Sequence, residues 1–201
     1  MMQEKNLMIM PKIKAASSQD LDCCVDAIVL AFSKDPCVRW MYSDPHQYLE
    51  NMPYFVRLFA GRAFTSGTAH YIDRFAGVAL WLPPGVQPDE EKLVSLIKRS
   101  VAPSQHENVF AFIEQMAAYH PSEPHYHLPM IGVDSIWQGQ GYGSMLLKHA
   151  LVTCNYQKLP LYLESTNPKN VPLYKRHGFE VIGTIQVETS PPCFPMLRQP
   201  Q

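Results

Sequence analysis

One segment of this 201-residue chain constrains its fold more than any other, the run Gln138-Gly139-Gln140-Gly141-Tyr142-Gly143-Ser144. It follows a strand candidate over 125–133. The residues over 139–153 form a glycine loop that enters an amphipathic helix. Glycines let the chain turn tightly and bring N–H groups close to a ligand, and a helix N-terminus adds donors and partial positive charge. The segment predicts an anion site suited to a pyrophosphate, with a glycine-rich turn that binds nothing as the alternative.

The glycine spacing excludes two common nucleotide-binding loops. A Walker A loop needs GxxxxGK[ST], which is absent, and a dinucleotide fingerprint needs GxGxxG, whereas the glycines here run GxGxG. The anion site is therefore expected in a different strand–loop–helix setting.

Apolar periodicity elsewhere predicts a mixed α/β (α+β) domain. We expect helices over 18–32, ended by Asp35-Pro36, over 45–64, twice within 88–118, over 139–153 and over 167–177. We expect strands over 11–16, 68–73, 75–82, 125–133, 161–164, 179–187 and 194–197. This order implies a mixed sheet with helices packed on it, formed by a single domain over 11–201 behind a tail over 1–10.

A second cluster surrounds the predicted short helix. Asn167 can cap this helix and Gly178 can end it, with Tyr174 one turn before that end. A tyrosine with an ordinary pKa near 10 is protonated at neutral pH, so Tyr174 can serve as a general acid. An amphipathic core residue is the alternative for Tyr174.

Taken together, the two clusters resemble the GNAT superfamily of acetyl-coenzyme A-dependent N-acetyltransferases. Gln138, Gly141 and Gly143 fit that family's [QR]xxGx[GA] signature, and Asn167 stands seven residues before Tyr174, which is followed by Gly178-Phe179. The firm resemblance covers about 125–198. Within it, the run 163–198 is similar to puromycin N-acetyltransferase and its relatives.

The resemblance implies a mostly antiparallel sheet flanked by helices and splayed at the cofactor strand, with acetyl-CoA as cosubstrate. The pantetheine arm would pair with the backbone of 128–133, and a backbone N–H near Val133 would stabilise the oxyanion. Tyr174 would protonate the departing thiolate, and Asn167 would bind the arm or fix the helix. Implied cofactor contacts are Ile131, Gly132, Val133, Gln138, Gly139, Gln140, Gly141, Tyr142, Gly143, Ser144, Asn167, Asn170 and Tyr174.

The general base is less well defined by the resemblance. Glu123 and His120 precede the cofactor strand, where family members often shape the acceptor site, and either can take the amine proton directly or through water. Glu164 is a further candidate, because a buried carboxylate there would need a partner. Bound water is the remaining alternative.

His125 and His127 alternate along the strand and would face the same side as a possible metal pair. No cysteine or acidic ligand completes that pair at a compelling spacing, so no metal site is predicted. Trp40, Tyr42, Trp81 and Tyr119 could line an aromatic acceptor pocket, although core packing is favoured for each.

Composition limits the remaining function classes. The 17 basic and 18 acidic side chains nearly cancel, which argues against nucleic-acid binding by charge. Five cysteines without CxxC spacing, no signal-peptide pattern and no long apolar stretch favour a soluble cytoplasmic protein, monomer or homodimer. We therefore expect acetyl transfer to a primary amine of a small molecule. The alternatives are a protein N-terminal or lysine acetyltransferase and a non-catalytic acetyl-CoA-binding module.

Overall fold

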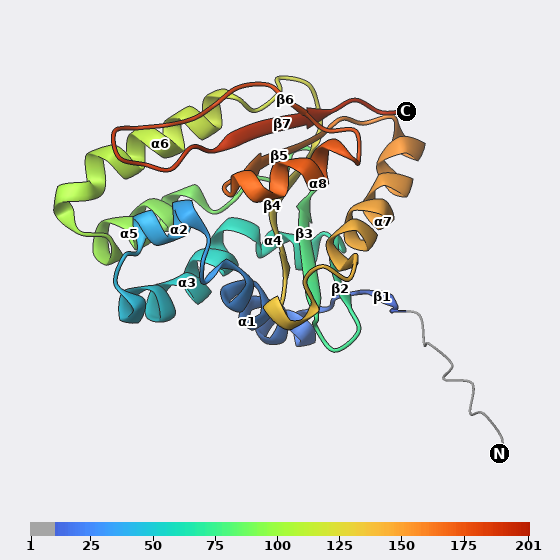
Figure 1. Cartoon of the computed structure of the whole chain (residues 1–201), viewed down its shortest axis with the longest axis horizontal. Coiled ribbons are helices and arrows are strands. Elements are labelled where there is room, and N and C mark those ends of the chain that lie inside the picture. Colours follow the sequence, from blue (N-terminus) through green and yellow to red (C-terminus); the bar gives the residue numbers. More distant parts are fainter. Residues whose placement is uncertain (1–10) are drawn as a thin grey trace, which may run out of the picture.

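The computed structural model describes residues 11–201 as one seven-stranded sheet with helices on both faces, and the predicted tail over 1–10 lies outside the described residues (Figure 1). The strands are β1 Ile13–Ala15, β2 Ala69–Ile72, β3 Gly77–Leu82, β4 Tyr126–Val133, β5 Leu161–Ser165, β6 Glu180–Val181 and β7 Phe194–Arg198. The helices are α1 Leu21–Phe32, α2 Pro36–Met41, α3 Pro45–Ala60, α4 Arg62–Thr65, α5 Glu90–Ser100, α6 His106–Ala118, α7 Tyr142–Gln157 and α8 Val171–Lys175. Short 3₁₀ turns span Ser18–Asp20, Pro103–Gln105, Ser135–Trp137 and Pro168–Asn170.

The sheet has the order β1-β2-β3-β4-β5-β7-β6. Every neighbouring pair in this sheet is antiparallel except β4 and β5, which are parallel. A parallel pair needs a crossover connection, and α7 supplies it by returning the chain from the end of β4 to the start of β5. The predicted mixed, mostly antiparallel sheet is confirmed.

The two parallel strands separate soon after they begin. β4 pairs with β5 only at Tyr126↔Leu161 and His127↔Tyr162. On its other edge β4 stays paired with β3 as far as Val133. The part of β4 from Leu128 to Val133 therefore has no partner strand on the β5 side, and this splay opens the sheet at its centre.

Two hydrophobic clusters cover the faces of the sheet. α1 and α3 pack on one face around Val78, Leu80 and Met130. α7 and α8 pack on the other around Leu128 and Leu163. α1 lies so close to β4 that a Cβ on Gly132 would stand 2.6 Å from the Cβ of Ala31. Gly132 thus has a packing reason as well as its predicted cofactor role.

One helix was not predicted and one predicted strand was too long, each for a local reason. Asp35-Pro36 was expected only to end a helix, but Asp35 also caps a new one: its carboxylate accepts the Val38 N–H at 3.1 Å, with Pro36 at the first position of α2. The strand expected over 179–187 shrinks to β6 and one bridge, Ile185↔Cys193. The chain beyond β6 runs beside α6 (Figure 1), and Phe112 of α6 and Ile185 belong to the same buried cluster.

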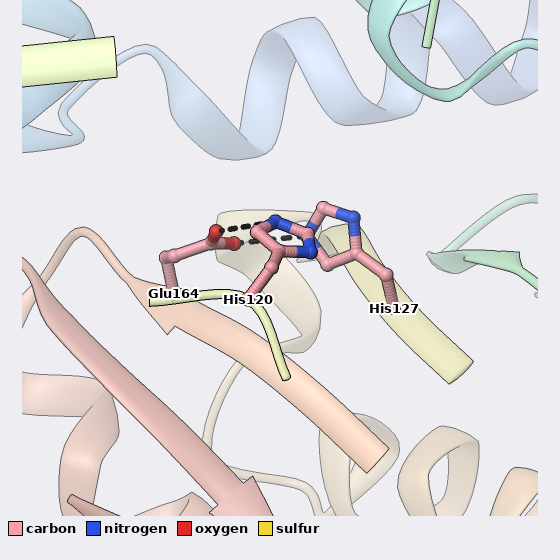
Figure 2. Close-up of side chains that lie close together, drawn as sticks. All are labelled: His120, His127 and Glu164. Carbon is pink, nitrogen blue, oxygen red and sulfur yellow. Dashed lines mark hydrogen bonds and ion pairs between the residues drawn. The ribbon is translucent and has the colours of Figure 1, made fainter. Parts of the chain in front are cut away.

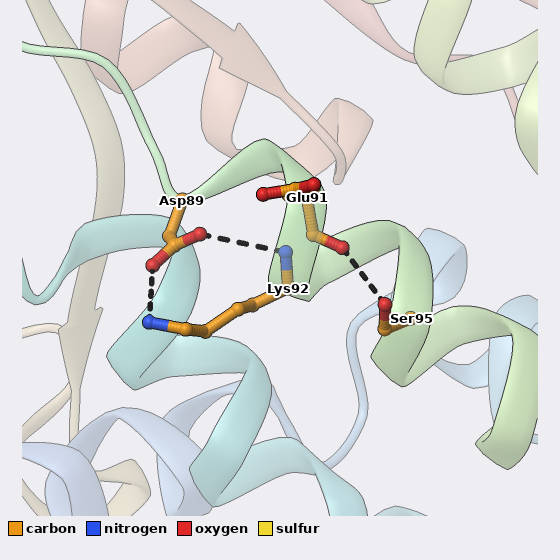
Figure 3. Close-up of polar contacts among 4 residues, drawn as sticks. All are labelled: Asp89, Glu91, Lys92 and Ser95. Atoms are coloured by element: carbon orange, nitrogen blue, oxygen red, sulfur yellow. Dashed lines mark hydrogen bonds and ion pairs between the residues drawn. The ribbon is translucent and has the colours of Figure 1, made fainter.

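The N-terminus of α5 anchors the loop that leaves β3. Asp89 accepts the Lys92 N–H at 3.4 Å and the Lys92 ammonium at 2.9 Å, and Ser95 donates to the Glu91 carbonyl at 3.0 Å (Figure 3). An acidic cap at a helix N-terminus satisfies unpaired donors and complements the helix dipole. Residues 82–87, which precede this cap, form one wall of a pocket described below.

Across residues 11–201, no helix combines the length and the apolar character needed to cross a membrane.

Candidate active site

A cleft of about 710 Å³, here called the cofactor cleft, lies where β4 and β5 separate. One end is the glycine loop, and the other is the region of Leu128, Glu164 and Tyr174. The predicted cofactor residues that line it are Ile131, Gly132, Val133, Gln138, Gly139, Gly141, Tyr142, Gly143, Ser144, Asn167, Asn170 and Tyr174. Segments as far apart in the sequence as residues 30–35 and 173–176 are thus assembled around one groove.

The glycine loop has the backbone that its composition predicts. Gly139 and Gly141 have φ of +77° and +86°, in the left-handed region, and a Cβ on either would meet nothing within 4 Å. Gly141 immediately precedes α7, so the unpaired N–H groups of the first turn begin at the cleft. The glycines are therefore needed for conformation, and their open side leaves room for a ligand.

Two loop side chains are used inside the protein. Gln138 donates to the Val133 carbonyl at 3.0 Å, which ties the loop to the end of β4. Gln140 donates to the Ile136 carbonyl at 3.2 Å and does not line the cleft. The contribution of Gln140 to a cofactor contact is thus restricted to its backbone.

Ser144 lines the cleft, but its hydroxyl is committed to His177. The ring Nδ1 of His177 lies 2.8 Å from the Leu173 carbonyl, and a carbonyl only accepts, so this nitrogen carries the proton. In the neutral ring, Nε2 then accepts from the Ser144 hydroxyl at 2.8 Å. The backbone N–H of Ser144 is left for an anion.

The asparagines divide between the two predicted roles. Asn167 accepts the Lys169 N–H at 3.1 Å and so caps the turn that leads into α8. Asn170 is exposed at the rim of the cleft. Lys34, Lys169 and Arg176 are exposed on the same rim and give it positive charge.

Tyr174 is buried at the inner end of the cleft, where its ring also packs on Phe179 at 6.1 Å between centroids. Burial, and secondarily the carboxylate of Asp35, raise the pKa of Tyr174 above its ordinary value. Burial also raises the pKa of Asp35. The hydrogen bonds that its carboxylate accepts from Thr166, at 2.6 Å, and from Val38 lower this pKa, but by less. Tyr174 therefore keeps its phenolic proton across the neutral range.

Three side chains meet behind this end of the cleft, here called the His–Glu cluster: His120, His127 and Glu164 (Figure 2). Glu164 Oε2 lies 2.9 Å from His127 Nε2, and Glu164 Oε1 lies 3.3 Å from His120 Nε2. The Glu164 side chain is 3% exposed, whereas the residue as a whole is partly exposed, so the cleft reaches its main chain. Burial would raise the pKa of Glu164, but the two imidazoles lower it to about 2.

A smaller hollow of about 450 Å³, here called the histidine pocket, opens on the other side of the cluster. Its lining includes His120, His125 and His127 together with the loop after β3. The predicted base candidates Glu123 and His120 both line it, but only His120 contacts a buried carboxylate. The Glu123 backbone carbonyl, 2.8 Å from His125 Nδ1, takes part in the arrangement instead.

The hydrogen bonds around the cluster form a directed chain. The Glu123 carbonyl only accepts, so His125 Nδ1 carries a proton. Burial lowers the pKa of His125, which favours the neutral ring, so its Nε2 accepts from His120 Nδ1 at 3.3 Å. His120 Nε2 then faces Glu164 Oε1, a buried oxygen with no hydrogen-bond partner. With its proton on Nδ1, His120 directs the Nε2 lone pair at this carboxylate oxygen, and a cation between the two atoms would stabilise that arrangement.

The cluster could not be found from sequence spacing. His120 lies in the loop after α6, His127 on β4 and Glu164 on β5. The pairing His127↔Tyr162 places Glu164 two positions along β5 on the same face. The predicted pair of His125 and His127 therefore omitted the acidic member that the parallel register supplies.

The predicted aromatic acceptor pocket is not found around either hollow. Tyr42 and Trp81 are buried in the core, while Trp40 and Tyr119 pack beside Phe112. Neither the cofactor cleft nor the histidine pocket is lined by any of the four. Core packing, the favoured interpretation, is confirmed for Tyr42 and Trp81.

Comparison with known proteins shows what the chain is similar to. Residues 103–181 match the family model described as the acetyltransferase (GNAT) domain. An uncharacterized N-acetyltransferase of Schizosaccharomyces pombe is 25% identical over 205 residues, which cover 94% of this chain and 83% of that protein.

Solved structures share the architecture along nearly the whole chain. A Corynebacterium glutamicum structure described as histone acetyltransferase HPA2 and related acetyltransferase superposes with a TM-score of 0.68 at 26% identity, covering 95% of this chain and 97% of that one. Arylalkylamine N-acetyltransferase 2 of Aedes aegypti superposes with a TM-score of 0.67 at 12% identity, covering 96% and 100%. The matched domain and the shared fold make this chain similar to the N-acetyltransferases of the GNAT superfamily, whose members use acetyl-CoA.

Proposed function

We propose that this enzyme transfers the acetyl group of acetyl-CoA to a small primary amine, which attacks the thioester directly in a ternary complex. One observation carries the proposal: a single cleft joins the glycine loop, the unpaired edge of β4, Tyr174 and the main chain of Glu164. We take residues 11–201 as one catalytic domain, because β1 and β7 belong to the same sheet.

The cleft suggests how the cofactor lies. The amides at the start of α7 and the rim cations Lys34, Lys169 and Arg176 suit the phosphates of acetyl-CoA. The pantetheine arm would add to the free edge of β4 as an extra strand does. Gln138 ties the Val133 end of β4 to the glycine loop, where the phosphates would bind. The thioester lies at the other end of the cofactor arm, so we place it and its oxyanion donor closer to Leu128.

The reaction then needs one acid and one base. The neutral amine nitrogen forms a bond to the thioester carbon, the carbon–sulfur bond breaks, and Tyr174 donates its proton to the thiolate. The amine loses its proton to the His–Glu cluster, directly or through one water. His125 and the histidine pocket connect the cluster to solvent, so the proton can leave without passing the cofactor.

The charge of the cleft favours a small acceptor over a lysine-rich protein segment. Its two carboxylates, Asp35 and Glu164, have buried side chains, so the cleft offers no exposed acidic group to a lysine-rich segment. The Aedes aegypti neighbour is named for arylalkylamines, which are small amines. The similarity to puromycin N-acetyltransferase and the monomeric or homodimeric state stay predictions from the sequence.

A protein acceptor is the second candidate, because the Corynebacterium glutamicum structure is described as a histone acetyltransferase. Thiol release from acetyl-CoA would be followed with a phenylethylamine, an aliphatic diamine and a lysine-containing peptide. We expect release with at least one small amine and none with the peptide. Release with the peptide alone would establish protein acetylation, and binding of acetyl-CoA without release would indicate a non-catalytic module.

The base assignment is tested by comparing the two buried carboxylates. We expect Glu164→Gln to lower kcat/KM about 100-fold at neutral pH, with the deficit shrinking as the pH approaches the pKa of the amine. Asp35→Asn should lower it less, and Glu114→Gln, an exposed change on α6, should leave it unchanged. A larger loss in Asp35→Asn than in Glu164→Gln would move the base to Asp35.

A further inference from the structure

The His–Glu cluster has a property that acetyl transfer does not require. Its three ligand-type atoms, one from each of His120, His127 and Glu164, lie within 4.8 Å of one another (Figure 2). Glu164 Oε1 and the neighbouring Tyr162 hydroxyl are buried without a hydrogen-bond partner. A buried carboxylate oxygen without a partner is costly, so a positively charged occupant would be stabilised there.

The orientation of the rings narrows what that occupant can be. In the tautomer in which His120 Nδ1 donates to His125 Nε2, the lone pair of His120 Nε2 points at Glu164 Oε1. A lone pair and a carboxylate oxygen that face each other are joined either by a proton or by a metal ion. Metal-bound imidazoles commonly donate their second N–H to a neighbouring acceptor, and His120 donates to His125 in this way.

We propose that His120, His127 and Glu164 form a binding site for a divalent transition-metal ion of the zinc class. Two imidazoles and one carboxylate are a donor set that zinc accepts at bond lengths of about 2.0–2.2 Å. Tetrahedral bonds of that length separate two ligand atoms by roughly 3.4 Å. The separations to Glu164 here are 2.9 and 3.3 Å, so small side-chain movements close the site.

The fourth coordination position would face the histidine pocket. His120 and His127 both line this pocket, and the His120 side chain is 25% exposed, so an ion can enter from solvent. Three protein ligands and one open position suit exchangeable binding better than a closed structural site.

Binding would have a consequence for catalysis, and this part rests on the proposed function. The ion would use the same nitrogen and oxygen atoms that accept the amine proton. Zinc should therefore inhibit acetyl transfer by occupying the base, without displacing acetyl-CoA from the cofactor cleft.

Metal binding is tested on the full chain after removal of metal with a chelator. Calorimetry with Zn²⁺ should give one ion per chain, and Co²⁺ should give the intense visible absorption of a four-coordinate ion. Glu164→Gln and His120→Gln should each weaken binding at least tenfold. His46→Ala, an exposed histidine at the start of α3, should bind as the wild type does. His120 lies in a loop, so its variant keeps the test valid if Glu164→Gln fails to fold.

The outcomes separate the metal site from its effect. Absence of binding, or binding that neither cluster variant weakens, would overturn the site. Zinc binding that leaves thiol release unchanged would keep the metal site and overturn the inhibitory role, and with it the base assignment. Thiol release that zinc inhibits in the wild type, over the concentration range in which calorimetry shows binding, would support both.

Discussion

The cofactor cleft and the His–Glu cluster lie side by side but are built in different ways. The cleft takes its glycine loop and free strand edge from one continuous stretch, 128–144, which presents N–H and C=O groups, and residues 30–35 and 163–176 supply its other walls. The cluster is made from side chains of His120, His127 and Glu164, which a loop and two strands bring together. A backbone site depends on local conformation, whereas a side-chain site depends on register between distant segments.

The comparison is sharpest at Gly141, where we expect the largest effect. Gly141→Glu places a carboxylate in the open space that the phosphates would occupy. The residue must also keep the left-handed backbone of Gly141, which has a φ of +86°. Acetyl-CoA affinity should fall by more than about 100-fold, or roughly 3 kcal/mol, as measured by calorimetry. Gly67→Glu is the matched control, since Gly67 also has a positive φ of +68° and open space but lies outside both hollows. Equal losses in both variants would mean that backbone strain, and not a phosphate site, is responsible.

Tyr174 joins the two regions, and its removal should affect chemistry more than binding. Tyr174→Phe should lower kcat by about 10²–10⁴-fold while acetyl-CoA affinity is retained. Because burial raises the pKa of Tyr174 above 10, the wild type should keep its general acid protonated up to that pH. Tyr126→Phe, a buried tyrosine on β4 that lines neither hollow, is the control. A kcat unchanged in Tyr174→Phe would assign the tyrosine to the core alone.

Gly132 tests whether the free edge of β4 also depends on packing behind it. A Cβ there would stand 2.6 Å from the Cβ of Ala31, so Gly132→Ala should push α1 away from the sheet. We expect a loss of about 1–3 kcal/mol in the free energy of unfolding, measured by chemical denaturation. A variant as stable as the wild type would show that α1 can shift at no cost.

The smallest effect is expected at Ser144. Because its hydroxyl donates to His177, Ser144→Ala should change acetyl-CoA affinity by less than about threefold, or roughly 0.6 kcal/mol. It should cost about 1 kcal/mol of stability through the lost hydrogen bond. A tenfold loss of affinity would mean that the hydroxyl leaves His177 to bind the cofactor.

Local signals in the sequence predicted much of the fold. The strand, glycine loop and helix over 125–153, the short helix ended by Gly178 and the mostly antiparallel sheet follow from periodicity, capping and motif spacing. The errors occurred where one residue serves two elements or where a neighbour intervenes. Asp35 both follows α1 and caps α2, and the chain beyond β6 is drawn onto α6, away from the sheet.

The sequence by itself determined the cofactor side of this protein, because glycine conformation, strand alternation and helix capping act over a few residues. Only the tertiary structure decided what stands opposite the cofactor. The parallel register of β4 and β5 places Glu164 beside His127, and the loop after α6 adds His120. No short-range pattern encodes such a meeting, because side chains far apart in the sequence become neighbours only when strands pair. The separation of β4 from β5 after His127 is likewise a tertiary feature, because it depends on how many residues of these two distant strands pair.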